Sequence, residues 1–261
     1  MKIMVCGKGG SGKSVVSVLM ARALAKERRV FLIDSDESNI LLPKLLGVES
    51  PKPLAEYLGD KKSVFRRGEA GVIRALGGAQ EGVRLDDLPH ECVSTSSEGV
   101  KLITVGKVRG FGEGCACPFN YLTKTLLKNM VLSEKEIVLI DTDAGIEHLG
   151  RGIEEECDAI LAVADPTAEA LVLAKSLKEF SQSRGKEFWL VLNKATPKVA
   201  EQVERRAREM GLEVDGVIGF DEEVFESCLE GGALRAEEAA RDVEEILRKV
   251  GLLGTEGEVK A

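Results

Sequence analysis

Residues 7–14 have the sequence Gly7-Lys8-Gly9-Gly10-Ser11-Gly12-Lys13-Ser14. This stretch matches the pattern G-x-x-x-x-G-K-S/T, and it lies between a short apolar run and a segment whose apolar residues recur at helical spacing. Small residues let backbone N–H groups surround phosphate at the N-terminus of a helix, where unpaired donors and the helix dipole both favour negative charge. The stretch therefore predicts a phosphate-binding loop, and with it a nucleotide site.

Two side chains of this loop have the chemistry that a nucleoside triphosphate requires. We expect Lys13 to reach the β and γ oxygens and the hydroxyl of Ser14 to bind Mg²⁺. The predicted nucleotide-binding residues of the loop are Gly9, Gly10, Ser11, Gly12, Lys13, Ser14 and Val15. The spacing does not distinguish ATP from GTP.

Short β-rich runs alternate with longer helical patterns along the rest of the chain. The predicted strands are 2–6, 30–33, 100–105, 137–140, 159–164, 188–192 and 214–218, and apolar residues recur at helical spacing within 15–23, 173–180, 199–210 and 239–250. This order predicts an α/β fold with a doubly wound, mostly parallel sheet and helices on both faces. Function in such a sheet lies at the carboxyl ends of the strands, so residues that follow each run are the candidates for chemistry.

Composition restricts the class of protein. The chain has 261 residues, a formal charge of −8 and 44 % apolar residues, which is enough for a full core. The negative balance argues against binding nucleic acid or anionic lipid by bulk charge, and no apolar run approaches a membrane span. We expect a cytoplasmic protein. The six cysteines are spaced irregularly, unlike a secreted disulfide framework, so their chemistry is expected to be metal binding or redox.

The domain organisation is predicted to be simple. Residues 1–250 form a single nucleotide-binding domain, and 251–261 form a C-terminal tail. Residues 60–98 are rich in glycine and show no clean period, so we expect an insertion with little regular structure. It is interpreted either as a solvated loop or as a docking surface for a partner.

Acidic side chains follow two of the predicted strands. Asp34 and Asp36 follow the strand 30–33, whereas Asp141 and Asp143 follow 137–140. Carboxylates at the ends of buried strands are costly unless they face water or a cation, so both pairs are expected to face the phosphate loop. The alternative for Asp36 is a role in capping.

The segment Lys-Gly-Gly-Ser-Gly-Lys-Ser resembles the deviant Walker A motif of the MinD, ParA and nitrogenase iron-protein superfamily. That resemblance implies ATP as the nucleotide and a homodimer in which Lys8 crosses to the nucleotide of the partner. It implies a catalytic role for Lys8, Lys13 and Asp36, with Asp36 positioning the attacking water. It also implies that Asp34 belongs to switch I, that Asp141 binds Mg²⁺ directly or through water, and that Asn193 contacts adenine.

Cys115 and Cys117 precede an apolar-periodic helix, and Pro118 suits its first turn. Thiolates are favoured near a helix N-terminus, where soft metals bind. One chain offers two such ligands and soft-metal sites usually use four, so a two-fold dimer could bring two Cys-x-Cys pairs together. The alternatives are an inert pair of small residues and a redox dithiol. Of the four remaining cysteines, Cys6, Cys157 and Cys228 are expected to be small core residues, and no role is predicted for Cys92.

The run from Asp141 to Gly152, with His148 and Arg151, resembles CooC-type nickel-insertion ATPases, which mature carbon monoxide dehydrogenase. Those proteins also carry a Cys-x-Cys pair ahead of a helix. The resemblance implies Ni²⁺, or Zn²⁺ in the same thiolate site, and carbon monoxide dehydrogenase as the client. His148 is interpreted as a hydrogen-bonded structural residue, with a relay between nucleotide and metal as the alternative.

The sequence hypothesis is therefore an ATP-dependent metallochaperone that binds nickel at a homodimer interface, with no nucleic-acid or membrane partner. Three alternatives stay open: an iron–sulfur carrier or reductase, a positioning or partition ATPase, and a metal sensor that binds ATP and hardly hydrolyses it. Four thiolates across a dimer could equally hold a [4Fe–4S] cluster.

Overall fold

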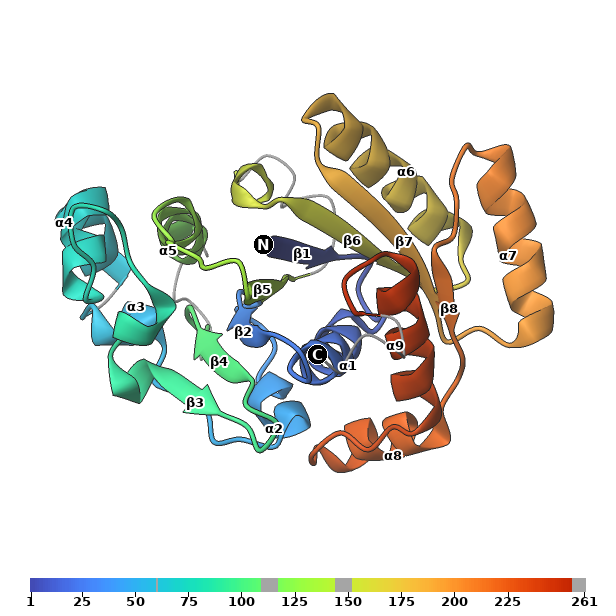
Figure 1. Ribbon diagram of the computed structural model, residues 1–261, viewed down its shortest axis with the longest axis horizontal. Helices are drawn as coiled ribbons and strands as arrows, with labels where there is room; N and C mark the ends of the chain where they lie inside the picture. Colours follow the sequence, from blue (N-terminus) through green and yellow to red (C-terminus); the bar gives the residue numbers. More distant parts are fainter. Residues whose placement is uncertain (60, 109–116, 144–151, 255–261) are drawn as a thin grey trace.

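A computed structural model describes residues 1–59, 61–108, 117–143 and 152–254. These residues form an eight-stranded sheet with the order β3-β4-β2-β5-β1-β6-β7-β8 (Figure 1). All neighbouring strands are parallel except β3 and β4, which are antiparallel. The strands are β1 (Lys2–Cys6), β2 (Arg29–Asp34), β3 (Val93–Thr95), β4 (Lys101–Thr104), β5 (Glu136–Asp141), β6 (Ala159–Ala164), β7 (Glu187–Asn193) and β8 (Gly216–Ile218). The predicted fold class is confirmed.

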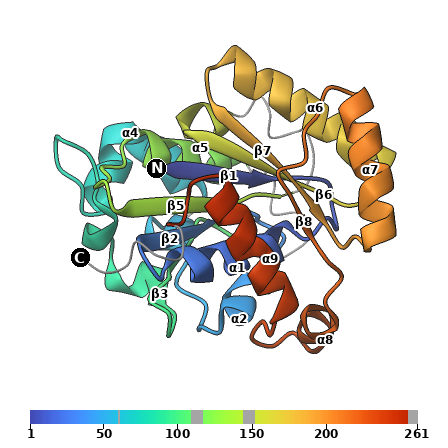
Figure 2. The same ribbon diagram turned by 45° about the vertical axis from the view of Figure 1, so that its right-hand side comes forward.

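Helices cover both faces of the sheet (Figures 1 and 2). They are α1 (Lys13–Leu24), α2 (Leu42–Leu46), α3 (Leu54–Tyr57), α4 (Lys61–Ala75), α5 (Cys117–Lys128), α6 (Ala168–Ser183), α7 (Pro197–Glu209), α8 (Glu222–Glu230) and α9 (Glu238–Lys249). Alternate residues of β1 point to opposite faces of the sheet. Ile3 and Val5 belong to the hydrophobic cluster that includes α1, α2 and α9, whereas Met4 belongs to the cluster that includes α3 to α6. Trp189, in β7, is buried.

The region 60–98 departs from the prediction of little regular structure. It contains α4, short 3₁₀ turns at Leu85–Asp87 and His90–Cys92, and the edge strand β3. The helical pattern of α4 is interrupted at Gly68, which has φ 63° and ψ 174°. Gly68 divides the segment into two short helical stretches, with the buried Val64 in the first and the buried Val72 in the second. The prediction is wrong for α4 because the break hides its period.

The sheet brings distant parts of the sequence to one edge. β1, β2 and β5 are neighbours, and the parallel register pairs Asp34 with Asp141 at their carboxyl ends. The loop that follows β1 lies beside them. No helix in the described part of the chain is both long and apolar enough to cross a membrane.

Candidate nucleotide site

Residues 7–12 connect β1 to α1 in a path that requires glycine at two positions. Gly7 has φ 155°, and a Cβ there would lie 2.2 Å from the carbonyl oxygen of Val163. Gly12 has φ 97°, and its Cβ would lie 2.3 Å from Nδ2 of Asn193. Gly12 is also the N-cap of α1, and no side chain caps this helix end. The first N–H groups of α1 therefore remain able to bind an anion, as the sequence motif predicts.

Lys13 and Ser14 begin α1 and face the edge of the sheet. Lys13 is only 7 % exposed, and its Nζ donates to the carbonyl of Lys8 at 3.3 Å. The hydroxyl of Ser14 donates to Oδ2 of Asp141 at 2.7 Å, and the hydroxyl of Ser17, one turn further along α1, donates to Oδ1 at 3.0 Å. The two serines thus hold both oxygens of Asp141 against the phosphate loop.

The carboxylates of Asp34 and Asp141 are both completely buried. Burial raises the pKa of Asp34 to about 7, although the Lys107 ammonium 2.7 Å away opposes the shift. Burial also raises the pKa of Asp141 to about 6, against the hydrogen bonds from Ser14 and Ser17. Such shifts mark carboxylates that lack the solvation a charge requires.

These residues fit a magnesium ion. Oδ1 of Asp34 is buried and has no hydrogen-bond partner among the described residues. Together with Asp141 and the Ser14 hydroxyl it offers hard oxygen ligands, which Mg²⁺ prefers. A bound cation would also stabilise the ionised form of both carboxylates.

Asp36 lies in the loop after β2 and lines the cavity beside Lys13 and Ser14. Its Oδ1 accepts from the N–H and the hydroxyl of Ser38 and from the N–H of Asn39, at 2.6–3.2 Å. These hydrogen bonds correspond to the capping role that the sequence offers as the alternative for Asp36. Asn39 in turn donates from Nδ2 to the hydroxyl of Ser14 at 2.8 Å, which joins this loop to the phosphate loop.

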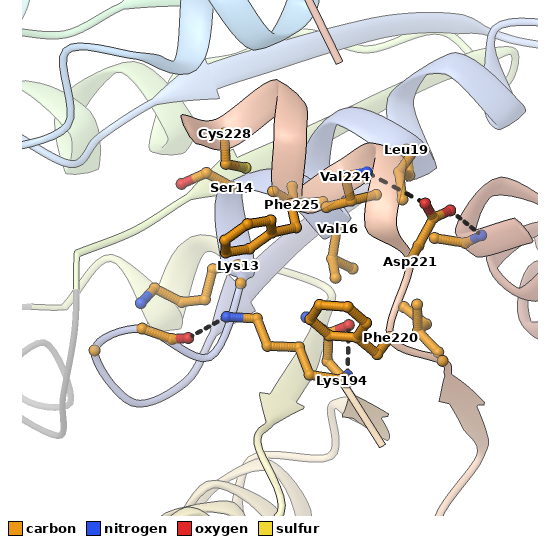
Figure 3. A pocket seen from close by; sticks show the side chains of 18 of the residues that line it. Lys13, Ser14, Val16, Leu19, Lys194, Phe220, Asp221, Val224, Phe225 and Cys228 are labelled. Carbon is orange, nitrogen blue, oxygen red and sulfur yellow. Dashed lines mark hydrogen bonds between the residues drawn. The ribbon is translucent and has the colours of Figure 1, made fainter. Parts of the chain in front are cut away.

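A cavity of about 490 Å³ extends from the phosphate loop to the loop after β8. Figure 3 shows the aromatic rings of Phe220 and Phe225 at its side, above Lys13 and Lys194. Their centroids are 6.2 Å apart, and the two side chains are 53 % and 56 % exposed. Cys228 also lines the cavity and is exposed, so its predicted place in the core is wrong. Exposed aromatic faces beside a phosphate loop suit the stacking of a base.

Asn193 follows β7 and supports the phosphate loop from the side. Its Nδ2 donates to the carbonyl of Ser11 at 2.8 Å, and its Oδ1 accepts from the N–H of Lys194 at 3.0 Å. Lys194 has φ 62°, and its ammonium donates to the carbonyl of Gly10 at 2.8 Å. Asn193 lines the cavity, and one N–H and one lone pair of its amide already form hydrogen bonds within the protein.

Lys8 points away from the other site residues. Its ammonium forms an ion pair with Glu169 on α6 at 2.9 Å, and the Glu169 side chain is 75 % exposed. This pairing raises the pKa of Lys8. The ion pair is an exposed one, which costs little to break.

The cysteine pair is described only in part. Cys117 is exposed and is the first residue of α5. Cys115 and His148 lie outside the described residues. Within the described part of the chain, no three His, Cys, Asp or Glu residues form a group that could hold a metal ion. The structure therefore does not test the predicted metal site. Cys6 and Cys157 are buried, as predicted, and burial raises the pKa of both thiols.

The sequence of the chain is similar to those of known nucleotide-binding proteins. Residues 2–111 match the CobQ/CobB/MinD/ParA nucleotide binding domain. The chain is 40 % identical over 252 residues to the uncharacterized ATP-binding protein MJ0084 of Methanocaldococcus jannaschii, covering 95 % of this chain and 100 % of the relative. The chain belongs to the MinD/ParA family of P-loop ATPases. This MinD/ParA-family protein is therefore an ATPase, and ATP is its nucleotide.

Two further likenesses concern function and fold separately. The ATPase is 38 % identical over 189 residues to the carbon monoxide dehydrogenase accessory protein CooC of Rhodospirillum rubrum, covering 71 % of this chain and 70 % of that protein. It is also similar to the MinD septum site-determining protein of Pyrococcus horikoshii complexed with Mg-ADP. That likeness has a TM-score of 0.65 and 18 % identity and covers 96 % and 95 % of the two chains, so it shows the shared fold.

The sequence interpretation missed several residues of the site. Phe220 and Phe225 follow β8, and the rule that function lies at the carboxyl ends of strands would have pointed to the first of them. Lys107 follows β4 in the same way. That rule gives only the position of Lys107. Its contacts, like the hydrogen bonds of the Asn193 amide, join loops that are far apart in the chain, so the sequence does not predict them.

Proposed function

We propose that this ATPase is a metallochaperone that binds nickel through Cys115 and Cys117 at a homodimer interface and inserts it into carbon monoxide dehydrogenase. The observation that carries the proposal is the exposed Cys117 at the N-terminus of α5. It lies in a chain that resembles CooC over 71 % of its length. A thiol at the start of a helix favours the thiolate form, which is the form that binds a soft metal.

The homodimer follows from the number of ligands. A Cys-x-Cys pair supplies two thiolates, and two copies related by a two-fold axis supply four. Binding of nickel and ATP between the same two subunits would make each ligand stabilise the dimer that the other requires. Release of the metal would then accompany hydrolysis, because loss of the γ-phosphate removes the contacts that hold the switch loops.

The residues around the phosphate loop have distinct roles in hydrolysis. Lys13 and the N–H groups at the start of α1 bind the triphosphate, and Asp36 orients the attacking water. Asp34, Asp141 and Ser14 would hold Mg²⁺, which neutralises developing charge on the phosphate oxygens when it is bound.

Lys8 acts on the nucleotide of the partner subunit. Its exposed ion pair with Glu169 supports this role, because the side chain can leave Glu169 at little cost. A cation delivered from the partner stabilises charge on the transferring phosphoryl group.

Phe220 and Phe225 are proposed to stack on the adenine base. Their exposed rings line the cavity that begins at the phosphate loop, and stacking of this kind contributes about 1–3 kcal/mol per base. The base would then displace water from the apolar faces of the Phe220 and Phe225 rings, and removing apolar surface from water favours binding.

Measurement of metal stoichiometry tests the function. The ATPase is loaded with Ni²⁺ and Mg·ATP, separated by gel filtration and analysed for metal. We expect one nickel per two chains in the dimer fraction, and none in the double variant Cys115→Ala, Cys117→Ala. Ser183→Ala is the control, since Ser183 is exposed on α6 and does not line the ATP cavity, and its nickel content should equal that of the unmodified protein.

Three results would refute the proposal. The first is unchanged nickel in the double variant, and the second is a chain that remains monomeric with both ligands. The third is a brown protein with a broad visible band after anaerobic purification, because that spectrum indicates an iron–sulfur cluster. Transfer is then tested by mixing the nickel-loaded dimer with nickel-free carbon monoxide dehydrogenase and following recovery of its activity with ATP or a non-hydrolysable analogue.

A further inference from the structure

Residues 105–108, which follow β4, lie along the nucleotide loop 34–39. The N–H of Val105 donates to the carbonyl of Asp34 at 3.0 Å, and the N–H of Val108 donates to the carbonyl of Glu37 at 3.1 Å. We call residues 105–108 the strap. In the chain, the strap precedes α5, the helix that begins with Cys117.

The side chain of Lys107 makes three further contacts between the strap and the nucleotide loop. Its ammonium is 2.7 Å from the carboxylate of Asp34 and 2.6 Å from the carbonyl oxygen of Asp36, and it also donates to the carbonyl of Asn39. The side chain is only 9 % exposed. An ammonium has three N–H donors, so these three oxygens, which span the nucleotide loop, use all of them.

The strap and the nucleotide loop both touch the first turns of α5. Gly106 lies against the ring of Phe119, since a Cβ at Gly106 would come within 2.4 Å of a ring carbon. The hydroxyl of Ser35 lies 3.0 Å from the hydroxyl of Thr123, and Thr123 donates to the carbonyl of Phe119. A continuous set of contacts therefore runs from the nucleotide loop to the helix that begins with Cys117.

We propose that Lys107 is a positioning residue that couples ATP binding to the N-terminus of α5, where Cys117 lies. The nucleotide loop carries Asp36, which lines the ATP cavity, and Lys107 makes the charged attachment between that loop and the strap. A shift of the loop toward a bound nucleotide is passed through Lys107 to the strap and, at Gly106, to the first turn of α5. Packed contacts of this kind carry coupling between sites.

The other attachments do not make Lys107 redundant. Two of them are backbone hydrogen bonds near the ends of the strap, and they persist in any variant. The Nζ atom of Lys107 contacts oxygens of Asp34, Asp36 and Asn39 at the same time. These three residues of the nucleotide loop are therefore held to each other, and to the strap, only while the ammonium is present. Its loss would remove the contacts to the Asp34 carboxylate and to the carbonyl oxygens of Asp36 and Asn39 together.

Thiol reactivity with and without nucleotide tests the proposal. Metal-free protein is alkylated with N-ethylmaleimide, with and without Mg·ATPγS, and the rate is followed by mass spectrometry on the tryptic peptide 110–124, which contains Cys115 and Cys117. The unmodified protein should show a rate that changes about 2-fold to 30-fold when the nucleotide is added, the range expected for coupling through a packed network. Lys107→Met should show one rate in both conditions, and Lys107→Arg, which retains the charge, should recover part of the change.

Binding of a fluorescent ATP analogue is measured for every variant, because the contacts of Lys107 lie on the nucleotide loop and the analogue should still bind. Lys178→Met is the control: this lysine also donates to a backbone carbonyl, that of Gly211 at 2.8 Å, but it lies on α6 outside the network. A full nucleotide effect in Lys107→Met would overturn the proposal, as would no effect in the unmodified protein. Loss of nucleotide binding in both Lys107 variants would also overturn it. The coupling rests on ATP binding within the proposed function, but this assay contains no nickel, so failure to bind nickel would leave its result unchanged.

Discussion

Gly12→Ala would place a methyl group at the tightest point between the phosphate loop and β7. The added Cβ would lie 2.3 Å from Nδ2 of Asn193, at a backbone position with φ 97°. The amide would have to move, and it would break its 2.8 Å hydrogen bond to the buried carbonyl of Ser11. A left-handed backbone costs alanine about 1–2 kcal/mol. An unpaired buried acceptor costs about 1–3 kcal/mol. We expect the free energy of unfolding to fall by about 2–5 kcal/mol.

Urea denaturation without nucleotide measures this loss, with Gly211→Ala as the control. Gly211 follows α7 and has φ 76°, and no atom lies within 4 Å of its Cβ, so only the backbone term applies. In an Asn193→Ala background the clashing amide is absent, and Gly12→Ala should then cost only about 1–2 kcal/mol. Equal losses for Gly12→Ala and Gly211→Ala would refute the reasoning, as would a cost at Gly12 that does not depend on Asn193.

Four further outcomes are expected. Because burial raises the pKa of Asp34 to about 7, affinity for Mg·ATP should rise between about pH 6 and pH 8, and Asp34→Asn should flatten that profile in titration calorimetry. The same shift makes the nucleotide-free fold bind protons more tightly than the unfolded chain, so its unfolding free energy should decrease as pH rises from about 4 to about 7. Lys8→Ala should lower ATP turnover at least about 10-fold without changing the melting temperature, whereas Glu169→Ala should leave turnover intact. Phe220→Ala should weaken ATP binding about 10-fold, whereas Leu229→Ala, which removes another exposed apolar side chain in the same region, should not.

The sequence was sufficient for the fold because its signals are local. Each predicted strand is a short apolar run bounded by glycine or a polar residue, and the phosphate loop carries its own pattern. The meeting of Asp34 with Asp141 was also predictable, since both residues end neighbouring parallel strands. These inferences needed only the spacing of apolar residues along the chain and the fact that neighbouring parallel strands end at the same edge of the sheet.

The sequence was insufficient where function depends on contacts between loops. Lys107 is one lysine among many until the structure shows three oxygens of another loop around its ammonium. Asn193 is a second example: the sequence places it directly after a strand, but it does not predict the hydrogen bond to Ser11. In α4 the break at Gly68 conceals the helical period, so the error there has a local cause.

The backbone hydrogen bonds at Val105 and Val108 have a consequence for how such ATPases diversify. Main-chain groups are the same in every residue other than proline, so these two attachments place few demands on the side chains. A chain that keeps Lys107, and a small residue at position 106 beside Phe119, can change the sequence that follows residue 108. Its contacts with the nucleotide loop are then kept. Loops of different sequence can in this way follow β4 while these two hydrogen bonds to the nucleotide loop are kept.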